Sequence, residues 1–384
     1  MGPSDLQTSI RVRPISTSAD RKRFIDFQYT FYQDEPHWIA PLRLDVSKTL
    51  NPKKNAFFEH GDIQLFLAED AGGQVVGRIA AIYNGEHLKK YDDGNGFFGF
   101  FECIDDEQVA AALFAEARDW LKTKGLTGMR GPVNPSMNDV SALLVDGFDR
   151  EPAILMPYNK PYYERLVTAN GLTRAMTTWA YYLHKKYVQI DKMRRGAKIV
   201  RRRNPSITLR TIDMGRYDQE TRTILDIYNE AWSNNWGHVA MTPGEFAQLA
   251  ADMKQVIDPR IVYILEDNGT PIAFSISLPN LNQALRQNRN GALLKAVPRL
   301  LLQPKFGGVY EIRMPLMGVR QAYHGKALDT LMVLETIEKG PSYGYDACEM
   351  SWVLDSNKVL INSLESMGGV VDKEYALYEE RFVS

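Results

Sequence analysis

One order of predicted strands and helices is written twice along the chain, at a spacing of about 190 residues. Each copy begins with a strand, at 10–15 and again at 207–212, and ends with a strand, at 177–183 and 374–382. Between them lie a helix, an aromatic loop, a hairpin, and strands that alternate with helices. The repetition predicts a duplicated α/β (α+β) domain. We place the first domain at 1–184, a basic linker at 185–206 and the second domain at 207–384.

The composition is ordinary for a globular protein. The net charge of −1 argues against a whole-protein electrostatic field that would attract nucleic acid. Cys103 and Cys348 lie far apart in strand-like runs, and we predict that both are buried thiols. The six histidines show no metal-ligand spacing, and no secretory signal or membrane-spanning segment is recognisable. We therefore expect a cytoplasmic protein without a metal.

A strand-to-helix turn in the second copy carries the clearest chemical signal. The strand predicted at 310–319 runs into the segment 320–327, and a helix is predicted to open at Ala327. Small residues at Gly325 and Ala327 let a ligand approach the backbone. The free N–H groups of the first helical turn, together with the helix dipole, suit a pyrophosphate, and Arg320 and Lys326 add positive charge. An ordinary strand-to-helix turn can have the same local sequence. The position of this turn after the fourth strand of the copy favours a pyrophosphate site over an ordinary turn.

The pattern Gln321-x-x-x-Gly325-x-Ala327 resembles the acyl-CoA pyrophosphate loop of the GNAT superfamily, with one extra residue before the glycine. The strand at 347–354, Asn357 and the helix after it resemble the segments that flank the pantetheine arm in that family. The resemblance covers residues 206–384. It implies two tandem GNAT-like domains, each a mixed, mostly antiparallel twisted sheet flanked by helices, with acyl-CoA or CoA as co-substrate. The cofactor-binding residues that it implies are Leu316, Met317, Gly318, Val319, Arg320, Gln321, Ala322, His324, Gly325, Lys326, Ala327 and Asn357.

The first copy lacks this loop. Its strand 97–104 passes directly into Asp105-Asp106-Glu107 without a glycine. Carboxylates at a helix start satisfy the helix dipole themselves and repel a phosphate. We expect that the N-terminal domain does not bind CoA and instead walls an acceptor groove.

Amide formation from a thioester needs a neutral amine, so a general base is expected beside the acceptor. Glu311 lies near the start of the strand that leads to the loop, where the resemblance places the glutamate base. A surface or ion-paired glutamate is the alternative, and Arg313 on the same strand face could neutralise it. His238 is a second candidate base. The family's usual tyrosine acid corresponds to Leu364 here, which leaves Tyr323, with His324 and Ser363, as candidate proton donors.

Two loops are candidates for the acceptor site. In GNAT folds the connection between the first two helices lines the acceptor groove, which points to a tryptophan-rich loop in this chain; plain core packing is the alternative. Its candidate residues are Trp232, Asn235 and Trp236. Asn138 and Tyr158, in polar runs beside prolines, are candidate contributions from the first copy.

Two basic segments each have two alternative interpretations. The insertion at 281–306 reads as a basic amphipathic helix, which either packs on its own domain or forms an interfacial element for a long acyl chain or a lipid. The linker at 185–206 either presents a solvated face or binds anionic lipid or nucleic acid.

The leading interpretation is an acyl-CoA-dependent N-acyltransferase, and the whole chain is similar to a group of tandem-GNAT proteins that includes bacterial ceramide synthase. The narrower match depends on the Met156-Pro157-Tyr158-Asn159 run, the tryptophan loop and the overall length. It implies a sphingoid-base acceptor and peripheral membrane contact through 281–306. The alternatives are a tRNA-dependent aminoacyl transferase of tandem-GNAT type, with RNA on the basic linker, and a non-catalytic acyl-CoA sensor.

Overall fold

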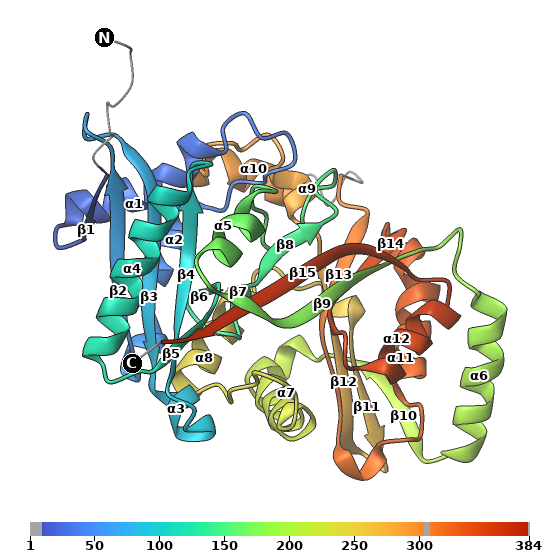
Figure 1. The fold of residues 1–384 in the computed structure, drawn as a ribbon. Helices are drawn as coiled ribbons and strands as arrows, with labels where there is room; N and C mark the ends of the chain where they lie inside the picture. The colour runs from blue at the N-terminus through green and yellow to red at the C-terminus, as the bar shows by residue number, and fades with distance from the viewer. Residues whose placement is uncertain (1–9, 303–307, 383–384) are drawn as a thin grey trace. The chain divides into compact units, whose positions relative to one another are not determined.

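A computed structural model describes residues 10–302 and 308–382, except the side chains of residues 297 and 299–302. The chain divides into two compact units. The first unit holds residues 1–177, 288–293 and 375–384, and the second holds residues 178–287 and 294–374. Figure 1 labels their helices and strands.

The first unit is built on a sheet in the order β1-β2-β3-β4-β5-β15, in which only β4 and β5 pair in parallel. Its strands are β1 (Arg11–Pro14), β2 (Gly61–Glu69), β3 (Val75–Asn84), β4 (Asn95–Cys103), β5 (Gly128–Gly131), β6 (Val133–Asn134), β7 (Val140–Ser141), β8 (Leu143–Asp146) and part of β15 (Val370–Arg381). Its helices are α1 (Ser18–Phe31), α2 (Arg43–Thr49), α3 (Gly85–Tyr91), α4 (Glu107–Thr123) and α5 (Tyr163–Ala169). An apolar stripe of α4, which includes Leu113, Phe114 and Ala117, packs on the sheet and forms the core of this unit.

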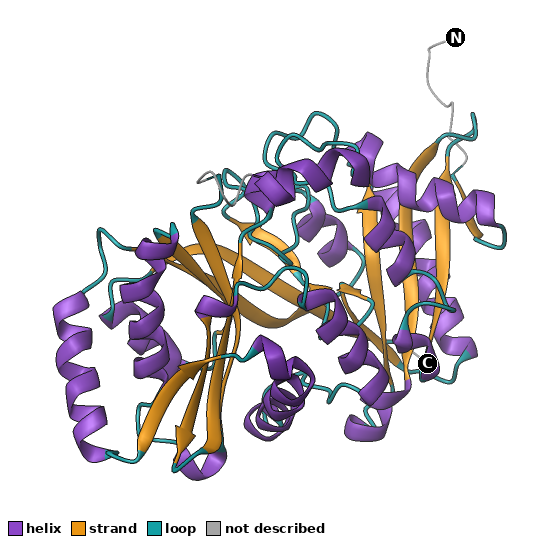
Figure 2. Cartoon of the chain, turned by 180° about the vertical axis from the view of Figure 1, so that it is seen from behind, coloured by secondary structure: helices purple, strands orange, loops and turns teal. Residues whose placement is uncertain are grey.

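The second unit repeats the plan with the order β9-β14-β13-β12-β11-β10, in which only β13 and β14 are parallel. Its strands are part of β9 (Thr173–His184), β10 (Ile207–Thr211), β11 (Val262–Asp267), β12 (Thr270–Pro279), β13 (Glu311–Val319) and β14 (Ala347–Leu354). Its helices are α6 (Ile190–Arg203), α7 (Tyr217–Trp232), α8 (Pro243–Met253), α9 (Asn282–Leu285), α10 (Leu293–Leu302), α11 (Asp329–Lys339) and α12 (Lys358–Ser366). The mixed, mostly antiparallel sheets flanked by helices confirm the predicted fold class (Figure 2).

The last strand of each sequence copy is shared between the units. Residues 178–184 of β9, which close the first copy, pair with β14 in the second unit. Residues 378–381 of β15, which close the second copy, pair with β5 in the first unit. The units therefore differ from the predicted domain limits at 184 and 207. The predicted linker contains α6, which packs in the second unit through Met193, Ala197 and Val200.

The two faces of the second sheet differ in chemistry. Because side chains alternate along a strand, Ile312 and Met314 of β13 face the same side as Tyr181, Leu183 and Cys348. These residues form an apolar core with α6, α11 and α12. The opposite face packs against α7 at its outer strands and is polar at β9, β14 and β13. The candidate base Glu311 lies on that polar face.

Several local predictions are confirmed and others need correction. Asn268 and Gly269, at the predicted hairpin turn, both have positive φ, and both cysteines are free and buried. The helix predicted to open at Ala327 begins at Asp329, after the 3₁₀ turn η5 (Gln321–Tyr323). The insertion at 281–306 is not one helix, because a turn at Gly291 with positive φ separates α9 from α10. Its residues 303–306 lie outside the described residues.

Candidate active site

Glu311, the first residue of β13, is held by two neutral donors. The hydroxyl of Tyr182 in β9 donates to its Oε1 at 2.9 Å, and the side-chain amide of Asn280 donates to its Oε2 at 3.1 Å. The Gln283 side-chain oxygen accepts from the backbone N–H groups of Tyr310 and Glu311 and fixes the strand end. Burial, followed by the charge of Glu311, raises the pKa of Tyr182 above its ordinary value, so this hydroxyl stays a donor. The half-buried carboxylate is thus oriented without an ammonium or guanidinium group among these contacts.

A chain of buried polar groups continues across the same face. Arg313 donates to the hydroxyl of Ser351 at 2.8 Å, and that hydroxyl donates to Glu349 at 2.7 Å. Lys373 pairs with Glu349 at 3.5 Å and with Asp372. Each of these five side chains is less than 10% exposed. Two cations balance two carboxylates here, and hydrogen-bonded pairing is what allows charges to be buried.

The strands β13 and β14 separate after the pair Met314↔Met350, and we call this separation the second fork. Beyond it, β13 continues to Val319 with an edge that has no β14 partner. The N–H of Arg320 bonds to Ile272 across the ladder with β12. Because bonded and non-bonded pairs alternate, Met317 and Val319 direct their N–H and C=O groups away from β12. Both residues are half-buried, so this edge can receive an extended ligand.

Two side chains already bind the carbonyls of this edge. The indole N–H of Trp232 donates to the Met317 carbonyl at 3.0 Å, and Nε2 of His324 lies 2.9 Å from the Val319 carbonyl. In the described part of the chain, no acceptor is found for the outward N–H groups of Met317 and Val319. Two N–H donors along one strand edge are suited to the carbonyl oxygens of the amides in a pantetheine arm.

The loop after β13 is open to solvent. Arg320 and Tyr323 are half-buried, and the other residues from Gln321 to Ala327 are exposed. Helix α11 has no side-chain cap from its N-cap residue Leu328, and Gly325 and Ala327 have positive φ. Two of the first N–H groups of α11, those of Thr330 and Leu331, bond to the Ala327 and Leu328 carbonyls, so the N–H groups of the exposed turn before the helix are the ones that an anion can reach.

Two carboxylates lie beside this loop. Glu230 accepts from the Gln321 N–H at 2.9 Å and pairs with Arg320. Burial opposes ionisation of Glu230, but these two donors lower its pKa overall. Asp329, in the first turn of α11, accepts backbone N–H groups, and burial raises its pKa. Like Glu230, Asp329 places a carboxylate where the sequence predicts an anion site.

The remaining candidates in the second unit are placed as follows. The Tyr323 hydroxyl donates to Asp267 at 2.9 Å, and Lys326 lies over the Tyr323 ring. The Asn357 side chain caps α12 by accepting the Leu360 N–H. His238 is 6% exposed, with its Nδ1 3.4 Å from the Tyr228 hydroxyl. Asn235 and Trp236 are half-buried in the same loop.

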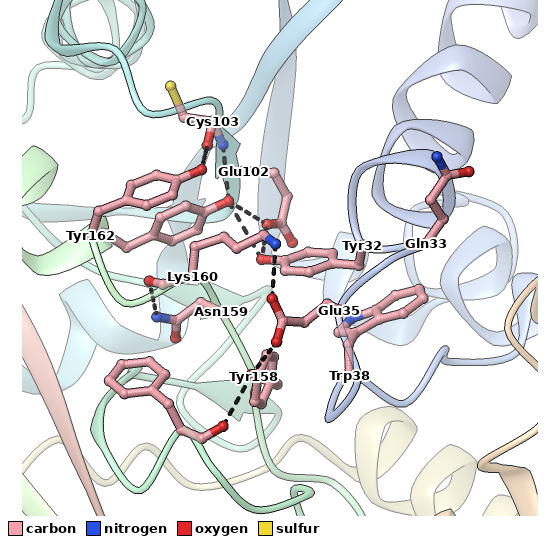
Figure 3. A network of polar contacts seen from close by, with 12 residues as sticks. Tyr32, Gln33, Glu35, Trp38, Glu102, Cys103, Tyr158, Asn159, Lys160 and Tyr162 are labelled. Carbon is pink, nitrogen blue, oxygen red and sulfur yellow. Dashed lines mark hydrogen bonds and ion pairs between the residues drawn. The ribbon is translucent and has the colours of Figure 1, made fainter.

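The first unit has a corresponding separation of β4 and β5 after the pair Phe97↔Arg130, which we call the first fork, and its own side chains fill it. The Ile104 N–H bonds to Val76, so Cys103 directs its backbone groups outward, as Val319 does. The Cys103 N–H donates to the Tyr163 hydroxyl at 3.0 Å, and the Tyr162 hydroxyl donates to the Cys103 carbonyl at 2.8 Å (Figure 3).

Buried polar groups surround this fork. Glu102 accepts from the hydroxyls of Tyr32 and Tyr163, and burial raises its pKa. Asp106 caps α4 by accepting the N–H groups of Gln108 and Val109, as its position at the helix start predicts. The groups that would bind a CoA in this unit are thus occupied by the chain itself.

Two further candidates lie in the first unit. The Tyr158 hydroxyl donates to Glu35, which also pairs with Lys160 (Figure 3). The Asn138 N–H bonds to Ser136 in a short polar turn. Both residues serve local contacts in this unit. Tyr182, in contrast, was not a sequence candidate, because it belongs to the first sequence copy and only the strand exchange brings it to Glu311.

The described residues contain neither a metal-binding cluster nor a helix that could cross a membrane. No group of three or more His, Cys, Asp and Glu side chains is arranged to hold a metal ion. Of the helices in the same residues, none is both long enough and apolar enough to span a bilayer.

Known proteins match the chain over nearly its whole length. It is 38% identical to bacterial ceramide synthase of Caulobacter vibrioides, over 97% of both chains. It is 35% identical to protein YghO of Escherichia coli, over 96% of this chain and 95% of that one. A tandem GNAT protein from the clavulanic acid biosynthesis pathway shares the fold, with a TM-score of 0.56 and 12% identity over 97% of this chain and 98% of that structure. No protein-family model matches. The chain therefore belongs to the bacterial ceramide synthase family of N-acyltransferases, built on the tandem GNAT fold.

Proposed function

We propose that the chain transfers an acyl group from acyl-CoA to the amine of a long-chain amino alcohol, a sphingoid base. The observation that carries this proposal is the arrangement along β13. A carboxylate held by neutral donors lies at its start, and an unpaired edge and an exposed turn with positive φ at Gly325 and Ala327 lie at its end. The acceptor class is supported by the name of the Caulobacter relative, which is 38% identical over 97% of the chain.

The chemistry assigns a separate task to each end of the strand. At the far end, the N–H groups of Met317 and Val319 bind the pantetheine amides, and the start of α11 binds the pyrophosphate. At the near end, Glu311 accepts a proton from the acceptor ammonium. The amine nitrogen then attacks the thioester carbonyl, the C–S bond breaks, and CoA leaves as the thiolate, which takes up the second proton that the nitrogen loses as the amide forms.

Neutral donors suit Glu311 to this role. A guanidinium in place of Tyr182 and Asn280 would stabilise the charged carboxylate and weaken it as a base. The hydroxyl and amide orient both oxygens while each oxygen keeps a free lone pair. The Arg313 guanidinium donates to Ser351, whose hydroxyl donates to Glu349. The charge of Arg313 is therefore part of the buried network around Glu349.

Release of free thiol from acyl-CoA in the presence of sphinganine tests the proposal. Glu311→Gln is expected to lower kcat/KM by about 10²- to 10⁴-fold while CoA binding persists, since a general base contributes about that much. Glu365→Gln is the matched control, because Glu365 accepts from the Tyr181 hydroxyl at 3.1 Å but lies on the apolar-core side of the sheet. Equal activity of the two variants would reject Glu311 as the base.

The acceptor is tested separately with amines of other classes. Turnover with sphinganine and acyl-CoA, and none with aminoacyl-tRNA as donor, supports the proposal. Thiol release with short polyamines but not with sphinganine would retain the acyltransferase and reject the lipid acceptor. CoA binding without turnover for any amine would favour an acyl-CoA sensor.

A further inference from the structure

The outer face of α6 is a cluster of unpaired cations. The fourteen residues of α6 include seven Lys and Arg and a single carboxylate, Asp191. The buried face, with Met193, Ala197 and Val200, packs in the core of the second unit. At 100° per residue, Arg195, Lys198 and Arg202 lie opposite that face. All three are exposed.

The charges of α6 fall into two groups. Arg194 pairs with Glu338, and Arg201 lies 4.0 Å from Glu335, so these two fasten the helix to α11. Arg195, Lys198, Arg202 and Arg203 form no ion pair within the described part of the chain. The buried face of α6 and its flank toward α11 therefore make the contacts with the second unit, and the cations of the opposite face make no ion pair with its described residues.

Apolar side chains accompany the free cations. Ile199 is 44% exposed, one residue after Lys198, and Tyr187, just before α6, is 70% exposed. An exposed isoleucine among cations is unfavourable in water and favourable at the boundary between lipid headgroups and acyl chains. Figure 1 shows α6 at the edge of the second unit, alongside α11 and α12.

We propose that the outer face of α6 docks the protein on an anionic lipid surface. The helix is about 21 Å long, at 1.5 Å per residue, so its cations contact several headgroups at once. The net charge of the chain is −1, so the attraction comes from this local cluster and not from the whole protein. The exposed aliphatic side chain of Ile199 among the cations favours a membrane over a nucleic acid, because acyl chains bury it and a phosphate backbone does not.

Vesicle sedimentation of the full chain, without acyl-CoA or amine, tests the docking independently of the proposed function. The protein is expected to bind vesicles that contain phosphatidylglycerol, and to bind phosphatidylcholine vesicles far more weakly. Raising the salt concentration from 0.05 to 0.5 M, about a threefold fall in Debye length, should release it. Unchanged binding at high salt would overturn the proposal, and this arm needs no variant.

The triple substitution Arg195→Gln, Lys198→Gln and Arg202→Gln is expected to lower partitioning roughly a hundredfold, at about fivefold for each cation. The control Arg11→Gln, Lys53→Gln and Lys54→Gln removes the same charge from exposed positions in the first unit and should leave binding unchanged. Ile199→Ser should lower partitioning several-fold without a change of charge. Equal loss in both triple variants, or tighter binding of single-stranded RNA than of vesicles through the same three cations, would overturn the proposal.

Discussion

The two forks start from the same strand geometry and end in opposite states. Cys103 and Val319 occupy matching positions, each one residue before a backbone bond back to the neighbouring strand. In the first fork, tyrosine hydroxyls take both backbone groups of Cys103, and Asp106 caps the helix that follows. In the second fork, the Val319 N–H has no acceptor among the described residues. The N-cap residue of α11 is Leu328, which makes no side-chain cap, and the carboxylate that accepts N–H groups there is Asp329, in the first turn. The same strand geometry in a duplicated fold can thus be filled by side chains in one copy and left open in the other.

The largest expected effect comes from making the second fork resemble the first. Ala327→Asp adds a carboxylate to the exposed turn, one residue before the N-cap Leu328 of α11, whereas in the first fork Asp106 is itself the N-cap of α4. The positive φ of Ala327 is one that aspartate tolerates. We expect CoA affinity to fall roughly a hundredfold, measured by calorimetry, because a carboxylate beside the pyrophosphate repels it.

Ala327→Asn separates charge from shape in this experiment. Asparagine has about the volume of aspartate and no charge. The CoA affinity of this variant should stay within about threefold of that of the natural protein, because asparagine does not repel the pyrophosphate. A hundredfold loss in both variants would show that side-chain volume and not charge weakens binding. An unchanged affinity of Ala327→Asp would show that the loop binds no anion.

The second prediction concerns the filled fork. Tyr163→Phe removes the acceptor of the Cys103 N–H and one of the two hydroxyl donors to the Glu102 carboxyl, in a fully buried position. The free energy of unfolding should fall by about 1–3 kcal/mol, measured by urea denaturation, while the KM for acyl-CoA stays unchanged.

Tyr162→Phe should cost less stability, because Tyr162 is half-buried and water can replace its bond to the Cys103 carbonyl. A change in KM for acyl-CoA in either variant would mean that the first fork also binds the co-substrate.

The third prediction tests the edge of the open fork. Trp232→Phe keeps an aromatic ring but removes the indole donor to the Met317 carbonyl. We expect the KM for acyl-CoA to rise about fivefold, the cost of about one hydrogen bond. If only the KM for the amine changed, Trp232 would belong to the acceptor site, as the sequence suggested.

The smallest effect concerns Asp329. Burial raises its pKa, so the folded protein holds this proton more tightly and loses stability as pH rises from the ordinary Asp pKa to the raised one. Asp329→Asn removes both that loss and the negative charge beside the loop. CoA affinity should rise about threefold, with the gain increasing as pH rises through the raised pKa, measured by calorimetry across pH. An unchanged affinity at every pH would place the carboxylate away from the ligand.

Local chemistry was readable from the sequence alone. The element order, the buried cysteines, the Asp-Asn-Gly turn and the capped start of α4 depend on neighbours within a few residues. The same is true of the loop at 320–327, although its first turn is 3₁₀ and α11 starts two residues later than predicted. Contacts within a few residues need no knowledge of how strands pair.

Only the tertiary structure decided which strands meet. The closing strands carry similar alternating patterns, so the sequence had no means to tell that β9 pairs with β14 and β15 with β5. That exchange places Tyr182 of the first copy on Glu311 of the second. A residue 129 positions away in sequence therefore orients the candidate base. Backbone pairing and burial across the sheet determine that contact, and a pattern within a few residues does not predict it.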